Sequence, residues 1–335
     1  MNNDRIQEIL DLMEEARLDY FLISDPQSIA YCTGYYNDPH ERMFVFMVSK
    51  HGNHTLFMND LFYLEHDLGV NIVWHKDGQD AIQTIVNEMH FPGRIGIDKN
   101  WASHFLLDLM KKLPNAKFIN ASPCVDLVRM KKDLQEQVLM IESSKINDAV
   151  MEEIIPFIQE GVSEKQLAKK LDELFFNHHS TCYGAIVAFG KNAADPHHEN
   201  DDTLLRKGNC VLIDMGCVYK GYCSDMTRTF FYGGIREDEM KVYEIVKKAN
   251  EAAEAMIKPG VKLSDIDKCA RKVISDEGYG QYFTHRLGHF IGRDVHEWGD
   301  VSQNYDIEVQ EGMTFSIEPG VYLQGEFGVR IEDLV

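Results

Sequence analysis

The sequence predicts a mixed α/β (α+β) protein of two domains, on three observations. The chain has 335 residues, which is more than twice the length of a typical domain. Residues 1–127 alternate short apolar strands with amphipathic helices, and a charged helical segment opens a second α/β region at residues 128–335. That second region contains an internal repeat. A repeat of this kind indicates two similar halves about a pseudo-twofold axis.

The first domain is predicted from its alternation of helices and strands. Apolar residues recur at helical spacing between residues 6 and 13, and a short apolar strand follows at residues 20–23. No catalytic motif occurs here, so the chemistry is expected in the second domain. The other expected elements are strands at residues 43–48, 54–58 and 94–98 and a helix from about residue 102 to residue 113.

Two strand segments of the second domain match position for position. Residues 208–216 and 312–320 each contain a glycine, a run of strand-forming residues, an isoleucine, an acid and a further glycine, and another acid follows each segment. A duplicated unit would bring the four acids into one cleft, whereas a chance likeness of short strands would not. The four acids are Asp214, Asp225, Glu318 and Glu332.

Four carboxylates in one cleft repel one another and need a cationic partner. Two divalent metal ions would neutralise them. Imidazole is available from His285, His289 and His296, which lie in one glycine-containing segment. Oxygen ligands with one imidazole suit manganese, cobalt or zinc better than copper. A solvated histidine-rich loop is the alternative interpretation of this segment.

Composition excludes several classes of partner and of structural site. The formal net charge is −20, which argues against nucleic acid and anionic membrane as partners. No run approaches the roughly 20 apolar residues that span a bilayer, and the first ten residues lack a signal-peptide pattern. The seven cysteines form no C-x-x-C pair and are odd in number, so neither a disulfide framework nor a zinc knuckle is expected. We therefore expect a cytoplasmic protein.

Five separated segments together resemble the pita-bread metallopeptidases, and more narrowly the Xaa-Pro branch that contains prolidase and aminopeptidase P. The resemblance implies a small creatinase-like α/β domain at residues 1–127, used for dimerisation and for capping the cleft, before a pita-bread catalytic domain at residues 128–335. Relatives usually continue past the position of Val335, so this domain is expected to lack its last few residues. The matching segments are residues 213–216, 224–230, 285–289, 316–320 and 330–333.

The resemblance implies a set of metal ligands. Asp214 would chelate one metal, Asp225 and Glu332 would bridge the two metals, and His289 with Glu318 would complete the second. Such enzymes commonly use Mn²⁺, with Co²⁺ or Zn²⁺ as substitutes.

The resemblance also implies roles in catalysis and substrate binding. Glu318 would carry a proton from the nucleophile to the leaving nitrogen. His197 and His296 would donate hydrogen bonds as negative charge develops on the carbonyl oxygen. His285 falls on a pocket histidine of the family. Arg286 follows it where these enzymes more often carry a small residue, which affects the expected shape of the pocket wall.

The predicted function is hydrolysis of Xaa-Pro dipeptides, with aminopeptidase P activity on longer Xaa-Pro peptides as the alternative. A strict dipeptidase must recognise the free carboxylate of its substrate, and Arg293 is our candidate for that contact. In the first domain, the polar loop at residues 37–42 contains Asp38 and His40. In a homodimer this loop would cap the site of the partner subunit and limit substrate length.

Two functions of other classes stay open. One is a metal-free, creatinase-like hydrolase, and the other is a non-catalytic peptide-binding module of pita-bread type. Both lineages have lost metal ligands, whereas all five are present in this chain. Metal analysis of the purified protein separates these two functions from the first.

Overall fold

The computed structural model describes all 335 residues, Met1 to Val335. The chain folds into two compact units, Met1–Arg129 and Met130–Val335, and each unit has its own hydrophobic core. The sequence predicts this division after residue 127. None of the helices combines the length and apolar character that crossing a membrane requires.

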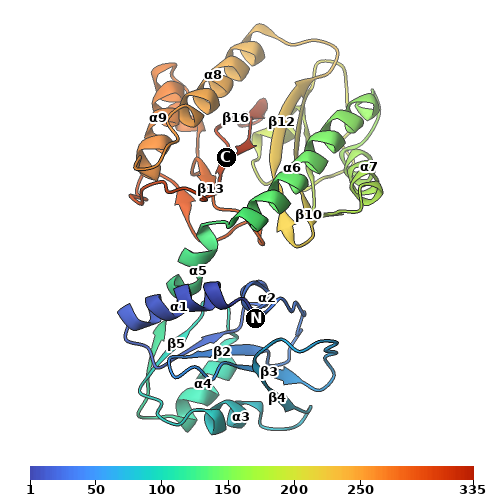
Figure 1. The fold of residues 1–335 in the computed structure, drawn as a ribbon. Coiled ribbons are helices and arrows are strands. Elements are labelled where there is room, and N and C mark those ends of the chain that lie inside the picture. The colour runs from blue at the N-terminus through green and yellow to red at the C-terminus, as the bar shows by residue number, and fades with distance from the viewer. The chain divides into compact units, whose positions relative to one another are not determined.

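A six-stranded mixed sheet forms the first unit, with the strand order β4-β3-β2-β1-β5-β6. β1 (Tyr20–Ile23) lies antiparallel to β2 and parallel to β5. All its residues are buried, because helices cover both faces of the sheet (Figure 1). The other strands are β2 (Val45–Ser49), β3 (Thr55–Asn59), β4 (Asn71–His75), β5 (Arg94–Ile97) and β6 (Lys117–Asn120).

The helices of this unit pack their apolar faces on the sheet. In α1 (Asn3–Glu15), Ile9 is fully buried in the same core as Phe21 of β1. Tyr20 and Leu22 alternate with Phe21 along the strand and belong to the core on the opposite face. The other helices are α2 (Pro26–Thr33), α3 (Ala81–Glu88), α4 (Ser103–Lys112) and α5 (Pro123–Met130).

The strands expected at residues 20–23, 43–48, 54–58 and 94–98 are confirmed, with small shifts of their ends. The apolar pattern does not predict β4 and β6. Both are edge strands of the sheet, and most of their residues are exposed or only partly buried. Neither therefore carries the continuous apolar run of a central strand.

Two α/β halves, each with a pair of packed helices, build the second unit. α6 (Leu134–Ile154) packs against α7 (Glu164–Asn177), and α8 (Glu237–Glu254) packs against α9 (Leu263–Asp276). Figure 1 shows the two helix pairs on either side of the strands. This arrangement agrees with the two similar halves that the internal repeat predicts.

Short strands connect these helices and carry the acids of the repeat. In the first half, β9 (Cys210–Met215) lies between β8 (Ile186–Phe189) and β12 (Met226–Phe231), antiparallel to both. A second small sheet contains β7 (Thr181–Cys182), β10 (Cys217–Tyr219) and β11 (Tyr222–Cys223). The second half has three strand pairs: β13 (Gly288–His289) with β14 (Asp300–Val301), β15 (Ser316–Ile317) with β18 (Asp333–Leu334), and β16 (Gly320–Leu323) with β17 (Phe327–Arg330).

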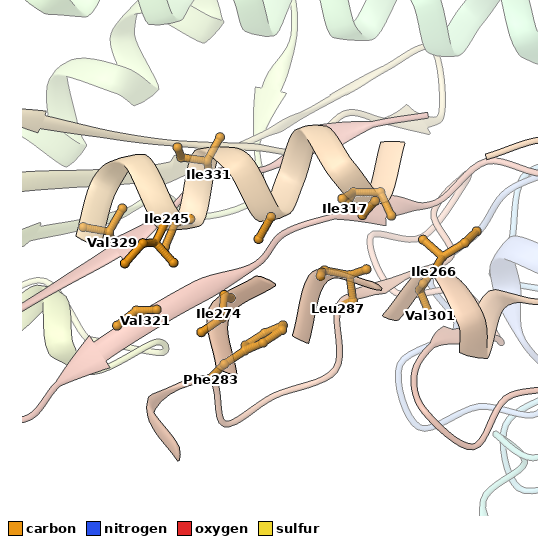
Figure 2. Close-up of a cluster of buried hydrophobic side chains, with 14 of the residues drawn as sticks. Ile245, Ile266, Ile274, Phe283, Leu287, Val301, Ile317, Val321, Val329 and Ile331 are labelled. Atoms are coloured by element: carbon orange, nitrogen blue, oxygen red, sulfur yellow. The ribbon is translucent and has the colours of Figure 1, made fainter. Parts of the chain in front are cut away.

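An apolar cluster between α8, α9 and these strand pairs holds the second half together (Figure 2). Ile245 of α8 and Ile274 of α9 belong to it, as does Ile317 of β15. Phe283 and Leu287 also contribute buried side chains. The cluster therefore anchors both ends of the segment that leads into β13. The predicted pocket histidine His285 lies in this segment.

Candidate metal centre

The pairing of β9 with β12 brings the first two acids to one end of their sheet. Asp214 lies on β9 opposite Thr227, and Asp225 comes directly before β12. The same register, extended, places Asp225 opposite Gly216. That glycine is needed for packing, since a Cβ there would lie 1.8 Å from the hydroxyl oxygen of Tyr183. Both carboxylates reach the same cavity.

The pairing of β15 with β18 brings the other two acids together. Ile317 lies opposite Asp333, so the next pair in this antiparallel register is Glu318 and Glu332. The backbone N–H of Glu332 donates to the carbonyl oxygen of Thr227 at 3.1 Å, which joins this strand pair to β12. The four acids of the repeat therefore meet in one place, one pair from each half.

His289 reaches the acids through the close packing of β13 on β15. A Cβ on Gly288 would lie 1.8 Å from the carbonyl oxygen of Ser316, so only glycine allows this approach. The backbone N–H of His289 donates to Oγ of Ser316 at 3.0 Å, and this hydroxyl donates to Oε1 of Glu318 at 3.2 Å. One serine thus holds both the histidine backbone and the glutamate carboxylate.

A cavity of about 820 Å³ has all five predicted metal ligands in its wall. Its volume lies in the range of small-molecule binding sites. The other predicted site residues that line it are His197, His285 and His296. Arg286, expected to affect the pocket wall, also lines it, and the polar lining residues not expected from the sequence are Tyr183, Asp195, Thr284 and Arg330.

Burial and mutual repulsion raise the pKa values of the acids. Burial, and then the charge of Asp214, raise the pKa of Asp225 well above its ordinary value. Burial, and then the charge of Asp225, do the same to the pKa of Glu332. Burial raises the pKa of Glu318 to about 7, although the nearby Arg330 opposes the rise. Cations between these carboxylates would stabilise their ionised forms.

The orientation of His289 also indicates that a cation belongs between the carboxylates. Its Nδ1 lies 3.2 Å from the carbonyl oxygen of Phe290, which can only accept, so Nδ1 carries the proton. Its Nε2 then presents a lone pair to Oδ2 of Asp225 and Oε1 of Glu318, each 3.6 Å away. Burial lowers the pKa of His289 to about 3, so the ring is neutral near pH 7.

A lone pair that faces two ionised carboxylates is repulsive unless a cation lies between them. Asp225, His289 and Glu332 offer donor atoms that all lie within 4.8 Å of one another. Imidazole nitrogen with carboxylate oxygen is a common ligand set for divalent metals, and the Nδ1 contact to a carbonyl is the usual way to orient such a histidine. The residues present therefore fit the predicted metal ions.

Arg330 is a buried cation to which the sequence analysis gives no role. Its side chain is 3% exposed, and Nη2 donates to Oδ2 of Asp214 at 2.6 Å. Its Nε donates to Oγ1 of Thr227 and its Nη1 to the hydroxyl oxygen of Tyr322, both at 3.0 Å. The guanidinium therefore compensates one carboxylate and fixes its orientation. The signal in the sequence is its place two residues before Glu332, on the same side of an extended segment.

The same network fixes His285. Its Nδ1 lies 2.6 Å from the carbonyl oxygen of Arg286, so Nδ1 donates. Burial lowers the pKa of His285 to about 4, so the ring is neutral near pH 7 and Nε2 accepts from the hydroxyl of Tyr322 at 2.8 Å. Because Tyr322 itself accepts from Arg330, one hydrogen-bonded chain joins His285 to the acid cluster.

His296 packs directly against the proposed ligand His289. The two rings lie 4.1 Å apart between centroids in an edge-to-face arrangement. Burial, and then the charge of Arg286, lower the pKa of His296, so its neutral ring keeps one N–H to donate. The neighbouring Glu297 forms a buried ion pair with Lys132 at 2.9 Å. This pair anchors the loop that carries His296.

His197 lies beside a second anchored point. The neighbouring His198 donates from Nε2 to the fully buried carboxylate of Glu164 at 2.7 Å, and the backbone N–H of Asp201 donates to it at 3.1 Å. Glu164, His198 and Asp201 are residue types that can bind a metal ion. However, the oxygens of Glu164 also accept from the backbone N–H of Phe189 and from an asparagine amide. The cluster therefore fastens the loop that carries His197 by hydrogen bonds.

One predicted substrate-binding residue of the second unit is not brought to the cavity wall. Arg293 is absent from the lining, because its backbone is held by Glu297 at 3.0 Å and its guanidinium lies over the ring of Tyr222 at 5.3 Å. Asp38 and His40 belong to the first unit, and their side chains are 65% and 73% exposed. Their predicted roles stay predictions.

Comparison with known proteins agrees with this site. Residues 138–335 match the model of metallopeptidase family M24, and residues 5–131 match that of the creatinase/prolidase N-terminal domain. An uncharacterised peptidase of Staphylococcus aureus is 33% identical over 98% of this chain and 95% of its own length. A dipeptidase structure from Pyrococcus horikoshii is 36% identical with a TM-score of 0.91, covering 98% of this chain and 94% of that chain. A prolidase structure from Thermococcus sibiricus is 32% identical with a TM-score of 0.92, covering 100% and 94%.

The motifs that suggested the resemblance are therefore supported over the whole chain, in both units. The small mixed sheet with helices on both faces is the creatinase/prolidase N-terminal domain, and the two α/β halves around the acid cluster are the pita-bread domain. This chain belongs to metallopeptidase family M24.

Proposed function

We propose that this metallopeptidase hydrolyses the bond before proline in Xaa-Pro dipeptides and uses two divalent metal ions, most readily Mn²⁺, with Co²⁺ or Zn²⁺ as substitutes. The observation that carries the proposal is the convergence of four acids and one neutral imidazole on a single cavity. The printed titles of similar structures, a dipeptidase and a prolidase, support the substrate class.

Asp214, Asp225, His289, Glu318 and Glu332 would hold the metal ions. Asp225 and Glu332 are the most deeply buried of the acids, which suits residues shared between two cations. Asp214 already shares one oxygen with Arg330. When bound, such ions supply an activated water and a Lewis acid for the carbonyl oxygen.

Side chains of the protein would transfer the proton and stabilise the developing negative charge. Glu318, held by Ser316, would accept the proton of the attacking water and return it to the proline nitrogen, which must gain a proton to leave. His296 and His197 would donate hydrogen bonds to the carbonyl oxygen as it gains negative charge. Their loops are fastened through Glu297 and Glu164, so both donors are held in place before the substrate arrives.

The alternatives of other classes are less well supported by this site. In a metal-free hydrolase or a non-catalytic module, the four acids of the site would be buried with Arg330 as the one cation that forms an ion pair with them. Such burial of ionised groups is costly. Aminopeptidase P activity stays the alternative within the family, because it requires the same ligands. We also propose a homodimer in which Asp38 and His40 approach the partner's cavity.

The test is an assay of the purified protein on Ala-Pro and Ala-Pro-Ala, with Mn²⁺ added or with metal removed by a chelator. We expect cleavage of the dipeptide that depends on metal and a much weaker cleavage of the tripeptide. Efficient cleavage of Ala-Pro-Ala would favour aminopeptidase P. Failure to cleave either peptide in the presence of Mn²⁺, Co²⁺ or Zn²⁺ would reject the proposed function.

A further inference from the structure

Two arginines line the cavity, and Arg286 is the more exposed of them. Arg330 is buried, and each of its three guanidinium nitrogens already donates within the protein, to Thr227, to Tyr322 and to Asp214. Arg286 is 36% exposed in its side chain. It donates through Nη1 to Asp300, which leaves Nε and Nη2 for a ligand.

The backbone around Arg286 is held on both sides by α9. Arg271 donates to the carbonyl oxygen of Phe283 at 3.0 Å and to that of His285. The fully buried Asp267 accepts from Nε of Arg271 at 2.7 Å and from the backbone N–H of Leu287 at 3.0 Å. Residues 283–287 therefore form a fixed loop, and the position of its arginine is set before any ligand binds.

Asp300 fixes the side chain in turn. It lies opposite His289 in the β13–β14 pair, so the carboxylate that receives Arg286 is attached to the strand next to a proposed metal ligand. Arg286 and His296 line the same cavity. The guanidinium is thus placed at the cavity wall, near the proposed oxyanion donor.

The charge of the cavity makes this cation chemically important. The lining contains five acids (Asp195, Asp214, Asp225, Glu318 and Glu332). The proposed metal ions would neutralise the four acids that hold them, so the free carboxylate of a substrate needs a further fixed cation of its own. A guanidinium whose Nε–Nη2 edge is free is suited to that contact.

We propose that Arg286, held by Asp300, binds the free α-carboxylate of the dipeptide substrate and thereby restricts the enzyme to dipeptides. The inference rests on the proposed function and assigns its substrate selectivity to one residue. It replaces Arg293 as the candidate for this contact, because Arg293 does not line the cavity.

The test compares Ala-Pro with its amide, Ala-prolinamide, in wild type and Arg286→Gln. Loss of a charge-assisted hydrogen bond should lower kcat/KM for Ala-Pro by about tenfold to a hundredfold. The amide should be a poor substrate for the wild type, and its kcat/KM should barely change in the variant. Arg286→Lys, which keeps the charge and loses the planar fork, should recover part of the activity on Ala-Pro. Arg206→Gln, an exposed arginine outside the cavity lining, is the matched control.

Binding of the product provides a readout that is independent of turnover. Calorimetric titration of wild type with L-proline and with L-prolinamide should show tighter binding of the acid, and Arg286→Gln should abolish that preference. Asp300→Asn should weaken proline binding while leaving prolinamide binding unchanged.

Three outcomes would overturn the inference. An equal loss on dipeptide and amide in Arg286→Gln would mean that the residue acts on a part common to both substrates. A loss selective for the dipeptide in Arg293→Ala, with none in Arg286→Gln, would assign the contact to Arg293. If Arg286→Gln failed to fold, an unchanged preference for the acid in Arg286→Lys and Asp300→Asn together would count against it. A wild type that cleaves no Xaa-Pro peptide would instead reject the proposed function, and the inference with it.

Discussion

Removing Lys132 should destabilise the protein far more than removing an ordinary surface lysine. Its side chain is 1% exposed and its Nζ lies 2.9 Å from Oε2 of Glu297, which is 5% exposed. Lys132→Met would leave a buried carboxylate without its cation. Breaking a buried pair from one side typically costs about 3–5 kcal/mol. Glu297 also accepts from the backbone N–H of Arg293 at 3.0 Å, so we expect the lower end, about 3 kcal/mol.

The assay is urea unfolding with a chelator present, so that bound metal adds nothing to the stability of either protein. Lys145→Met is the matched control, because Lys145 pairs with Glu142 at 2.8 Å with side chains 65% and 49% exposed. Its cost should stay below about 0.5 kcal/mol. Lys132→Met combined with Glu297→Gln should regain most of the loss, since no charge is then left buried. A single Lys132→Met variant as stable as the Lys145→Met control would refute the reasoning.

Three further predictions concern the site. Asp225→Asn should abolish activity and reduce metal content while the fold is kept, because an amide cannot share a negative charge between two ions; full metal content with normal turnover would contradict this. His296→Ala should keep its metal and lose about 10²–10³ in kcat, as expected for an oxyanion donor, whereas loss of metal would show that His296 is a ligand. Burial lowers the pKa of His285 from 6.5 to about 4. Between these two pH values His285 is protonated in the unfolded chain and neutral in the folded chain. Its contribution should therefore destabilise the protein by up to about 3 kcal/mol as the pH falls from 6.5 to 4, and urea unfolding of His285→Gln should show a shallower pH dependence than wild type.

The acids of the site could be predicted because the sequence repeats itself. Matching positions at Asp214 and Glu318, each followed by a second acid, are enough to expect four carboxylates in one cleft, and strand register then brings them together. The edge strands β4 and β6 could not be predicted in the same way. Their side chains lie partly in solvent, so they lack the apolar pattern on which strand prediction depends.

Arg293 and Arg286 show why the rest of the site needed a structure. Arg293 is four residues from His289 in the sequence, yet the loop between them turns its guanidinium onto Tyr222. Arg286 lines the cavity in a loop that α9 holds on both sides: Arg271 donates to the carbonyl groups of Phe283 and His285 before it, and Asp267 accepts from the backbone N–H of Leu287 after it. Side-chain direction in loops is set by such distant contacts, and periodicity contains no information about them.

The most direct test of the central claim is the metal content of the purified protein. After loading with Mn²⁺ and removal of free ions, elemental analysis should find two metal ions per chain. Removal of both with a chelator should abolish hydrolysis of Ala-Pro, and readdition should restore it. A protein that cleaves Ala-Pro at an undiminished rate with no bound metal would contradict the account, as would one that binds no divalent ion under any loading condition.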